Sequence, residues 1–265
     1  MKLTLKKKIS AILMSTFTFA ALIGLCFTAS IAMTRNYYDT IFVSGSSMNP
    51  TLYGGTGGLA KAPYIDEYNE YHSGEYVNFG LVDKSAKAKQ NIKRYDIVTT
   101  YYPSDYDGTG KLIESATYKI KRVIALPGET FRIVNGVLSV KTDGAFVVVE
   151  RKHLIDDGGQ VDIKDITERT LNENEYWVLG DHRSDSSDSG TMKRPVTLNM
   201  ITGVVVRIEG TAEFYYHYVC ENCEHEINEK DVLYGRVTKC DKCGGAIVTG
   251  KGDIRNRHYT FPKIV

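Results

Sequence analysis

The sequence lacks an excess of charge of either sign: its 33 lysine and arginine residues balance 32 aspartate and glutamate residues, for a formal net charge of +1. A large nucleic-acid interface needs a positive excess, so we expect no nucleic-acid partner. The chain also lacks internal repeats and low-complexity tracts, which argues against a repeat architecture. It lacks, finally, the alternation of strands with long amphipathic helices that is typical of α/β folds.

Short β-rich runs fill most of the chain instead, and Gly, Asn and Asp residues separate them. We therefore expect a mostly β protein in which residues 36–210 form one mainly antiparallel domain, with a hairpin at Asn135. The expected strands cover residues 97–102, 118–126, 130–134, 145–150, 175–179 and 203–208.

One long uncharged segment lies near the N-terminus. Four lysines among the first eight residues precede residues 9–33, which carry no charge. A helix of this length can cross the hydrocarbon core of a bilayer, and a cationic flank stays in the cytoplasm. We therefore predict a cytoplasmic basic segment at residues 1–8, one transmembrane helix at residues 9–33, and an extracytoplasmic remainder on the cell membrane. A cleaved signal peptide is the alternative, although its apolar core usually spans only about 7–15 residues.

A serine-rich turn, VSGSSMNPTL, occupies residues 43–52. Gly45 permits a tight turn that can present Ser47 where a backbone N–H points at a developing oxyanion. A serine hydroxyl is a poor nucleophile until a base takes its proton. A plain connecting loop is the alternative interpretation, and Ser44 and Ser46 compete for the role of nucleophile.

A lysine-bearing apolar run, KIKRVIALPGE, occupies residues 119–129. Strand alternation places Lys121 on one face with Val123 and Ala125. If that face is buried, desolvation lowers the pKa of the lysine, and the neutral amine can accept the serine proton. Two of the three basic residues in the run are expected to be solvated. The alternative is an edge strand whose lysines protect against aggregation.

A polar loop, GDHRSDSSDSG, follows the expected strand at residues 175–179. Its short carboxylates and hydroxyls can bind backbone groups and orient a neighbouring amine. A calcium-binding EF-hand loop needs glycine at its sixth position and glutamate at its twelfth, whereas Ser186 and Met192 stand there. His182 is expected to hydrogen-bond within the loop rather than to join a Ser-His-Asp triad.

Taken in order, the anchor and these segments resemble the type I signal peptidases, membrane-anchored Ser/Lys endopeptidases that remove signal peptides from exported preproteins. The resemblance implies a β-rich catalytic core at the membrane and no catalytic cofactor. The implied partners are preproteins with small residues at positions −1 and −3, the lipid bilayer and possible secretion machinery. The matching segments are residues 45–52, 94–103, 121–129 and 180–189.

The same resemblance assigns roles to individual residues. Ser47 looks like the nucleophile, Lys121 like the general base, and Ser186 like the hydroxyl that hydrogen-bonds to and orients the lysine. Asp181 and Asp188 look like structural supports of the site, and Gly45 supports the serine turn. Lysine at position 121 points to the bacterial branch, because relatives in the endoplasmic reticulum have histidine there.

Four positions depart from the family pattern. Gly190 replaces the usual arginine, which removes the expected cation beside Asp188. His182 replaces the usual asparagine, and Tyr95 replaces the usual glycine. Gly45 stands where some relatives have a serine hydroxyl that stabilises the oxyanion, so the N–H of the nucleophilic serine must supply that contact, with the neighbouring serines as possible helpers.

Residues 54–93 have no counterpart in the family pattern. Four tyrosines lie there among glycines and charged residues, a composition that suits a membrane interface. We expect a surface insertion, with contact to lipid or to a dedicated substrate as the functional hypothesis.

The C-terminal segment, residues 211–265, contains two C-x2-C pairs separated by 16 residues. This spacing is typical of a four-thiolate zinc ribbon, and a structural zinc ion can replace the core that such a small segment cannot build. Two disulfides are the alternative, since the predicted location is oxidising. The predicted ligands are Cys220, Cys223, Cys240 and Cys243.

The sequence thus favours signal peptidase I activity. One alternative is a peptidase dedicated to a single surface or pilus substrate, with the insertion and the ribbon supplying docking. Another is a membrane-tethered adaptor whose site has weakened through changes such as Gly190. Substrate range and oligomeric state stay open at this level.

Overall fold

The structure is a computed structural model, and it describes residues 14, 16–26, 28, 36–56, 58–135, 137–149 and 165–264. The chain divides into two compact units, Met1–Asp39 and Thr40–Val265. In the first unit, residues 14, 16–26 and 28 are helical. Within the described residues, no helix is both long enough and apolar enough to cross a membrane. The predicted basic segment 1–8 and the other residues of the predicted span lie outside the described residues.

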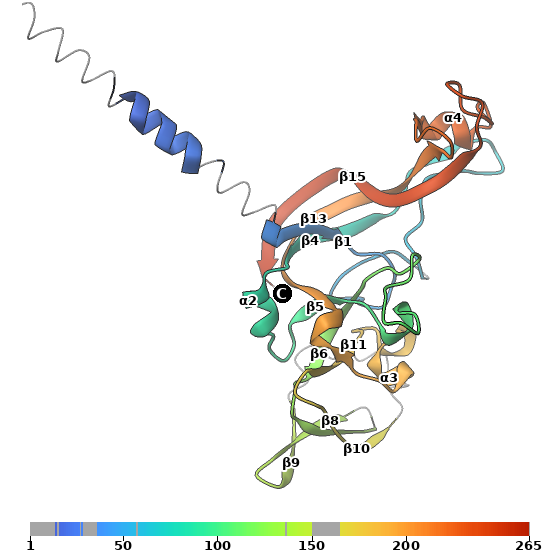
Figure 1. Cartoon of the computed structure of the whole chain (residues 1–265). Coiled ribbons are helices and arrows are strands. Elements are labelled where there is room, and N and C mark those ends of the chain that lie inside the picture. Colours follow the sequence, from blue (N-terminus) through green and yellow to red (C-terminus); the bar gives the residue numbers. More distant parts are fainter. Residues whose placement is uncertain are drawn as a thin grey trace, which may run out of the picture. The chain divides into compact units, whose positions relative to one another are not determined.

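A nine-stranded sheet organises the second unit (Figure 1). Its strands follow the order β1-β4-β13-β5-β6-β11-β12, and β14 and β15 pair with β13. Neighbours from β4 to β12 are antiparallel, which confirms the mostly β prediction. The strands are β1 (Tyr38–Phe42), β4 (Tyr76–Asp83), β5 (Ile97–Thr100), β6 (Lys119–Ala125), β11 (Glu175–Leu179), β12 (Val196–Thr197), β13 (Ile201–Cys220), β14 (Glu226–Ile227) and β15 (Ile247–Ile264).

Two smaller sheets complete the described strands. One has the order β10-β7-β8-β9, and the other is the hairpin of β2 and β3. Antiparallel pairing of β7 with β8 confirms the hairpin predicted at Asn135. The bounds are β2 (Tyr64–Ile65), β3 (Tyr71–His72), β7 (Thr130–Val134), β8 (Val137–Thr142), β9 (Ala145–Val148) and β10 (Ile166–Thr170), with short helices α2 (Ala86–Gln90), α3 (Ser189–Met192) and α4 (Glu229–Leu233).

The strand predictions are confirmed in position, but the expected surface insertion is wrong for part of residues 54–93. β4 lies inside that stretch and occupies the position between β1 and β13 in the main sheet. Val77 and Phe79 are fully buried there. The sequence did not predict β4 as a strand, because glycines and charged residues surround it and its alternation of buried and more exposed residues is short.

β13 is much longer than expected and pairs with β15 over most of its length. Figure 1 shows the two strands running side by side towards α4. The domain boundary that we predict after residue 210 falls within β13, and the backbone has no break there. The division of this unit into a peptidase domain and a ribbon therefore stays a prediction.

Separate clusters of buried side chains fill the two faces of the sheet. Met48 and Leu52, from the serine turn, pack with Ile97 and Ile120 in one cluster. Trp177 is the largest fully buried side chain, and its ring centroid lies 5.2 Å from that of Phe131 in the second sheet. Trp177 therefore joins the second sheet to the main one.

We expect Trp177→Ala to lower the free energy of unfolding by about 3–5 kcal/mol, because it removes a fully buried ring and leaves a cavity. Tyr68→Ala, at a side chain that is 78% exposed, should change it by less than about 0.5 kcal/mol. Urea denaturation followed by circular dichroism measures both. Equal midpoints for the two variants would contradict the packing described.

Candidate active site

The structure brings Ser47 and Lys121 together. The Lys121 Nζ lies 2.7 Å from the Ser47 Oγ and 2.9 Å from the carbonyl oxygen of Ile120. An amine that donates one hydrogen to that carbonyl keeps its lone pair for the serine hydroxyl. These two side chains are 74 residues apart in the sequence, so only the fold creates the pair.

The serine turn is anchored on both sides of Ser47. Gly45 has a φ of +100°, which only glycine adopts without strain, and its N–H donates to the carbonyl of Gly54 at 2.7 Å. Met48 is 1% exposed and fixes the other side in the core. In the described part of the chain, the N–H of Ser47 donates no hydrogen bond. It is therefore available to an incoming oxyanion.

The two competing serines are placed differently. Ser44 is exposed. Ser46 is buried and donates a hydrogen bond to the Asp185 carboxylate. The structure therefore brings neither hydroxyl to Lys121, and Ser46 serves to hold the turn against the polar loop.

Burial controls the charge of Lys121. β6 lies between β5 and β11, so the alternative of an edge strand is wrong, and Lys121 is 4% exposed. Desolvation lowers the pKa of Lys121 to about 8, while the carboxylates of Asp188 and Asp181 oppose that shift. About one lysine in ten is then neutral at pH 7, compared with about one in three thousand for an exposed lysine.

The expectation that the other two basic residues of β6 are solvated is wrong for Arg122, whereas the Lys119 side chain is 28% exposed. Arg122 is 2% exposed, and it forms a bidentate ion pair with the fully buried Asp181 at 2.8 and 2.6 Å. Lys119 is 2.6 Å from Asp105. Each cation has a carboxylate partner from a distant segment, and alternation along one strand does not reveal such partners.

Tyr95 explains one departure from the family pattern. Its φ is +75°, in the left-handed region that favours glycine. Its carbonyl accepts a hydrogen bond from Arg122 at 2.9 Å, and its N–H donates to the carbonyl of Val123 at 2.8 Å. Tyr95 thus adopts a backbone conformation that favours glycine.

The polar loop contacts the serine turn through backbone groups. The backbone N–H of His182 donates to the carbonyl of Ser47 at 3.0 Å. The imidazole does not make the hydrogen bond expected within the loop, because its Nδ1 is buried without a hydrogen-bond partner in the described part of the chain and lies 3.8 Å from the Asp185 carboxylate. A Cβ atom at Gly180 would lie 2.5 Å from the Ser47 carbonyl oxygen and 2.2 Å from the Ser186 Oγ. Glycine at position 180 is therefore required for this close approach.

Asp188 has backbone partners in place of the missing arginine. Its carboxylate accepts hydrogen bonds from the N–H groups of Gly180 and Gly190 at 2.9 Å each and from that of Thr191 at 3.4 Å. It caps α3 in this way. Gly190 is thus compatible with an ordered Asp188.

Ser186 lies beside the pair but does not make the expected contact. Its Oγ is buried and has no hydrogen-bond partner in the described part of the chain. The structure therefore lacks the Ser186–Lys121 hydrogen bond that the resemblance implies. A buried hydroxyl without a partner is destabilising by about 1–3 kcal/mol, so a small rearrangement that gives it a partner is favoured.

Two supporting residues were not anticipated. The Tyr102 hydroxyl donates to the carbonyl of Ser187 at 2.7 Å, and thereby fixes the polar loop to the main sheet. Arg122, on the same strand as Lys121, holds the Asp181 carboxylate through two hydrogen bonds. A buried tyrosine needs a partner for its hydroxyl, but no sequence signal indicates which carbonyl it reaches.

The four C-terminal cysteines form a second site. They are free thiols, and all four sulfur atoms lie within 4.8 Å of one another. Cys220 and Cys243 are 3.3 Å apart and Cys223 and Cys240 are 3.7 Å apart; a tetrahedral Zn–S bond of about 2.3 Å requires about 3.8 Å. Burial raises the pKa of the Cys220 thiol, but hydrogen bonds from the N–H groups of Cys223 and Asn222 have the larger combined effect, and the pKa is lowered to about 6. Four cysteines so placed can bind a metal.

Comparisons with known proteins indicate the family. Residues 13–209 match the family model described as signal peptidase, peptidase S26. The chain is 31% identical over 171 residues to signal peptidase I S of Bacillus subtilis (strain 168). This alignment covers 59% of this chain and 77% of that protein. A crystal structure of a signal peptidase I from Enterococcus faecalis V583 matches with 25% identity and a TM-score of 0.31, over 43% of this chain and 97% of that one.

We expect Asp181→Asn to destabilise the protein by about 3–5 kcal/mol, because it leaves the buried Arg122 without a carboxylate. Glu209→Gln, which breaks the more exposed pair with Arg207, should cost less than about 1 kcal/mol. Thermal and urea denaturation of the two variants provide the comparison. If Asp181→Asn were as stable as Glu209→Gln, the ion pair would not have the structural importance assigned to it.

Proposed function

This chain belongs to the signal peptidase family, peptidase S26, and is a serine endopeptidase of that family; on that basis we propose that Ser47 is its nucleophile and Lys121 its general base. The distance of 2.7 Å between Nζ and Oγ carries the proposal. It is supported by the burial that lowers the pKa of the amine. Proton transfer needs both a short distance and an unprotonated base.

Acylation follows from this geometry. The neutral Lys121 amine takes the proton of the Ser47 hydroxyl as Oγ attacks the carbonyl carbon of the scissile peptide bond. The oxyanion that forms accepts a hydrogen bond from the free N–H of Ser47. Lys121 then returns the proton to the leaving amine, the C–N bond breaks, and the substrate acyl group stays on Ser47 as an ester.

Deacylation uses the same residues. Lys121 is neutral again after the amine leaves, and it accepts a proton from a water molecule that attacks the ester. The bond between Oγ and the acyl carbon breaks, and Ser47 recovers its proton. A hydrogen bond donated by the Lys121 amine to the unpartnered Ser186 Oγ, formed when substrate binds, would keep the lone pair directed at the Ser47 Oγ through both steps.

The substrates in this proposal are exported preproteins with small residues at positions −1 and −3. Residues 9–33 anchor the enzyme as a single transmembrane helix, with residues 1–8 in the cytoplasm and the catalytic unit outside. The uncharged run and its lysine flank support this topology.

An adaptor with a weakened site fits the observations less well. A lysine that is 4% exposed and hydrogen-bonded to a serine is costly to maintain unless its neutral form is used. One observation supports the alternative of a dedicated peptidase. Tyr71, in the stretch 54–93, donates a hydrogen bond at 2.9 Å to Glu229 of α4, which lies between the two C-x2-C pairs in the sequence. The stretch 54–93 is thus in contact with the C-terminal segment that contains the four cysteines, which is called the cysteine module below.

We assign a structural zinc ion to Cys220, Cys223, Cys240 and Cys243. Four thiolates leave no open coordination position, so the ion stabilises the module and takes no part in peptide cleavage. The buried cluster that contains the cysteines is small, with Cys220, Ile227 and Cys240 as its buried members among the described residues. Metal ligation therefore contributes a large share of its stability.

The dyad is tested by cleavage of a preprotein in detergent, with product mass locating the cut. Ser47→Ala and Lys121→Met should each lower kcat/KM by at least about 10⁴-fold, because each removes one partner of the proton transfer. Ser44→Ala, at an exposed serine of the same turn, and Lys119→Gln, on the same face of the same strand, should retain most activity. Activity that survives either dyad substitution would refute the assignment.

Zinc is tested by elemental analysis of protein purified without added chelator, which should give about one zinc per chain. Cys223→Ser should abolish zinc binding and lower the thermal midpoint, whereas Cys26→Ser, at the cysteine outside the cluster, should change neither. A metal-free protein whose mass is about 4 Da below the fully reduced value would show two disulfides instead and overturn the assignment.

A further inference from the structure

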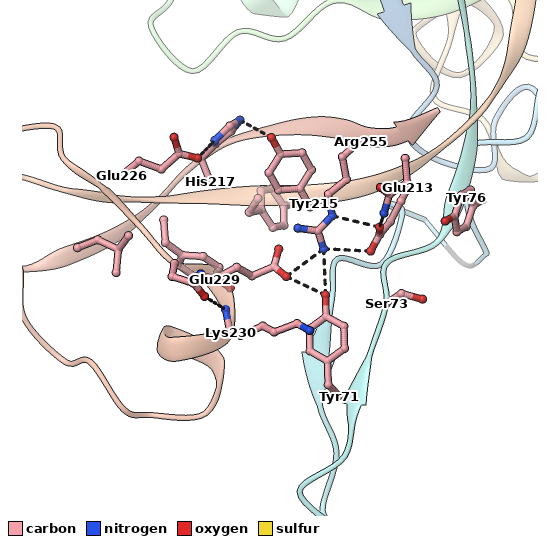
Figure 2. A pocket seen from close by; sticks show the side chains of 15 residues that line it. Tyr71, Ser73, Tyr76, Glu213, Tyr215, His217, Glu226, Glu229, Lys230 and Arg255 are labelled. Carbon is pink, nitrogen blue, oxygen red and sulfur yellow. Dashed lines mark hydrogen bonds and ion pairs between the residues drawn. The ribbon is translucent and has the colours of Figure 1, made fainter. Parts of the chain in front are cut away.

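A polar cavity of about 840 Å³ lies where three segments meet that are far apart in the sequence. Its walls come from β3 and the start of β4, from the β13–β15 ribbon, and from β14 and α4 of the cysteine module (Figure 2). It shares no residue with the Ser47–Lys121 site. Its volume is in the range of sites that bind small molecules or short peptide segments.

Arg255 joins all three walls, as the dashed lines in Figure 2 show. Its guanidinium donates to both carboxylate oxygens of Glu213 at 3.1 Å. It also donates to the Glu229 Oε1 at 3.0 Å and to the Tyr71 hydroxyl at 2.9 Å. Tyr71 in turn donates to the same Glu229 oxygen. These bonds preform the cavity without a ligand.

The lining has three carboxylates, those of Glu213, Glu226 and Glu229, and two lysine or arginine side chains, Arg255 and Lys230, so one carboxylate is in excess. Arg255 and the buried Glu213 neutralise each other, while Glu229 shares Arg255 through one oxygen. The Glu229 side chain is 11% exposed, and its Oε2 is buried without a hydrogen-bond partner in the described part of the chain, so a ligand reaches it only by displacing a neighbouring side chain. Glu226, also in the lining, is paired with His217 at 2.9 Å. The cavity therefore offers acceptors to a cationic donor.

Aromatic rings in the cavity already hold cations. The Lys230 Nζ lies 4.6 Å from the centroid of the Tyr71 ring, and the Arg255 guanidinium lies 4.8 Å from that of Tyr215. Tyr76 adds a further ring to the lining. Carboxylates beside tyrosine faces recognise lysine and arginine side chains through ion pairing and cation–π contacts.

We propose that this cavity binds a lysine- or arginine-bearing extended segment of the peptidase's protein substrate, at a distance from the scissile bond. The inference rests on the proposed function, because that function supplies the substrate. The site gives the enzyme a preference among preproteins that the small residues at −1 and −3 cannot provide. It also assigns a joint use to the stretch around Tyr71 and to the cysteine module.

Binding is measured first, with the full-length Ser47→Ala chain in detergent so that no cleavage occurs. A fluorescein-labelled decapeptide of alternating lysine and glycine should bind saturably at low salt, and the glutamate–glycine peptide should not. Glu229→Gln keeps the oxygen that Tyr71 and Arg255 use but removes the charge. It should weaken binding of the lysine peptide about tenfold.

The matched control is Glu221→Gln, which removes an exposed carboxylate of the same module outside the cavity and should change affinity by less than about twofold. Equal affinity of the parent chain and Glu229→Gln for the lysine peptide would overturn the proposal. Equal binding of the lysine and glutamate peptides would also overturn it.

Cleavage separates this proposal from the proposed function. In the chain with Ser47 intact, Glu229→Gln should raise KM about tenfold for a preprotein with a lysine-rich segment beyond the cleavage site, without changing kcat. KM for the same preprotein with serines in that segment should not change. If the active chain cleaves neither preprotein, the peptidase proposal fails while the binding result stands. If both are cleaved with KM values that Glu229→Gln does not alter, the cavity proposal fails and the peptidase stands.

Discussion

The desolvation of one amine, that of Lys121, is the constraint on which the rest of the site depends. A lysine becomes a base near neutral pH only where burial outweighs the carboxylates that favour its protonated form. Such a position exists on β6, an interior strand of the main sheet that is flanked by β5 and β11 and on which Lys121 is 4% exposed. The serine must then be brought to the lysine, because a buried amine cannot reach outward. Met48, Leu52 and Gly45 fix the serine turn against the same sheet.

The remaining contacts hold the third segment against this pair. Gly180 allows its backbone to approach Ser47 closely, and Asp188 binds the N–H groups that would otherwise leave the loop loose. Arg122 occupies the opposite face of β6 from Lys121, and its ion pair with Asp181 matches a buried charge with a buried countercharge. The two carboxylates that raise the pKa of Lys121, those of Asp181 and Asp188, thus have other hydrogen-bond partners, and desolvation outweighs their effect. The structure thus separates the two adjacent basic residues into an ionised one and one that can be neutral.

Much of the candidate site could be predicted from the sequence, because each of the segments that form it carries a local pattern. The turn at Gly45, the lysine strand, the polar loop and the two C-x2-C pairs each carry a short pattern with a direct physical meaning. The features that the sequence did not predict depend on contacts between residues that are far apart in the chain. The pairing of Arg122 with Asp181, the burial of β4 within a stretch that looks like a surface insertion, and the contact of Arg255 with Tyr71 across 184 residues leave no periodic signal. The cavity between the insertion and the cysteine module follows from such contacts, so only the folded chain reveals it.

We expect the pH dependence of kcat/KM to follow the deprotonation of the buried Lys121 amine. Below a pH of about 8, kcat/KM should fall about tenfold for each pH unit, because the active form is neutral Lys121; above it, kcat/KM should level off. The measurement uses one preprotein between pH 6 and pH 10, with circular dichroism at each pH to verify folding. A profile that is flat across this range, or that begins to rise only near the pKa of an exposed lysine, would contradict the claim that burial makes Lys121 the base for Ser47.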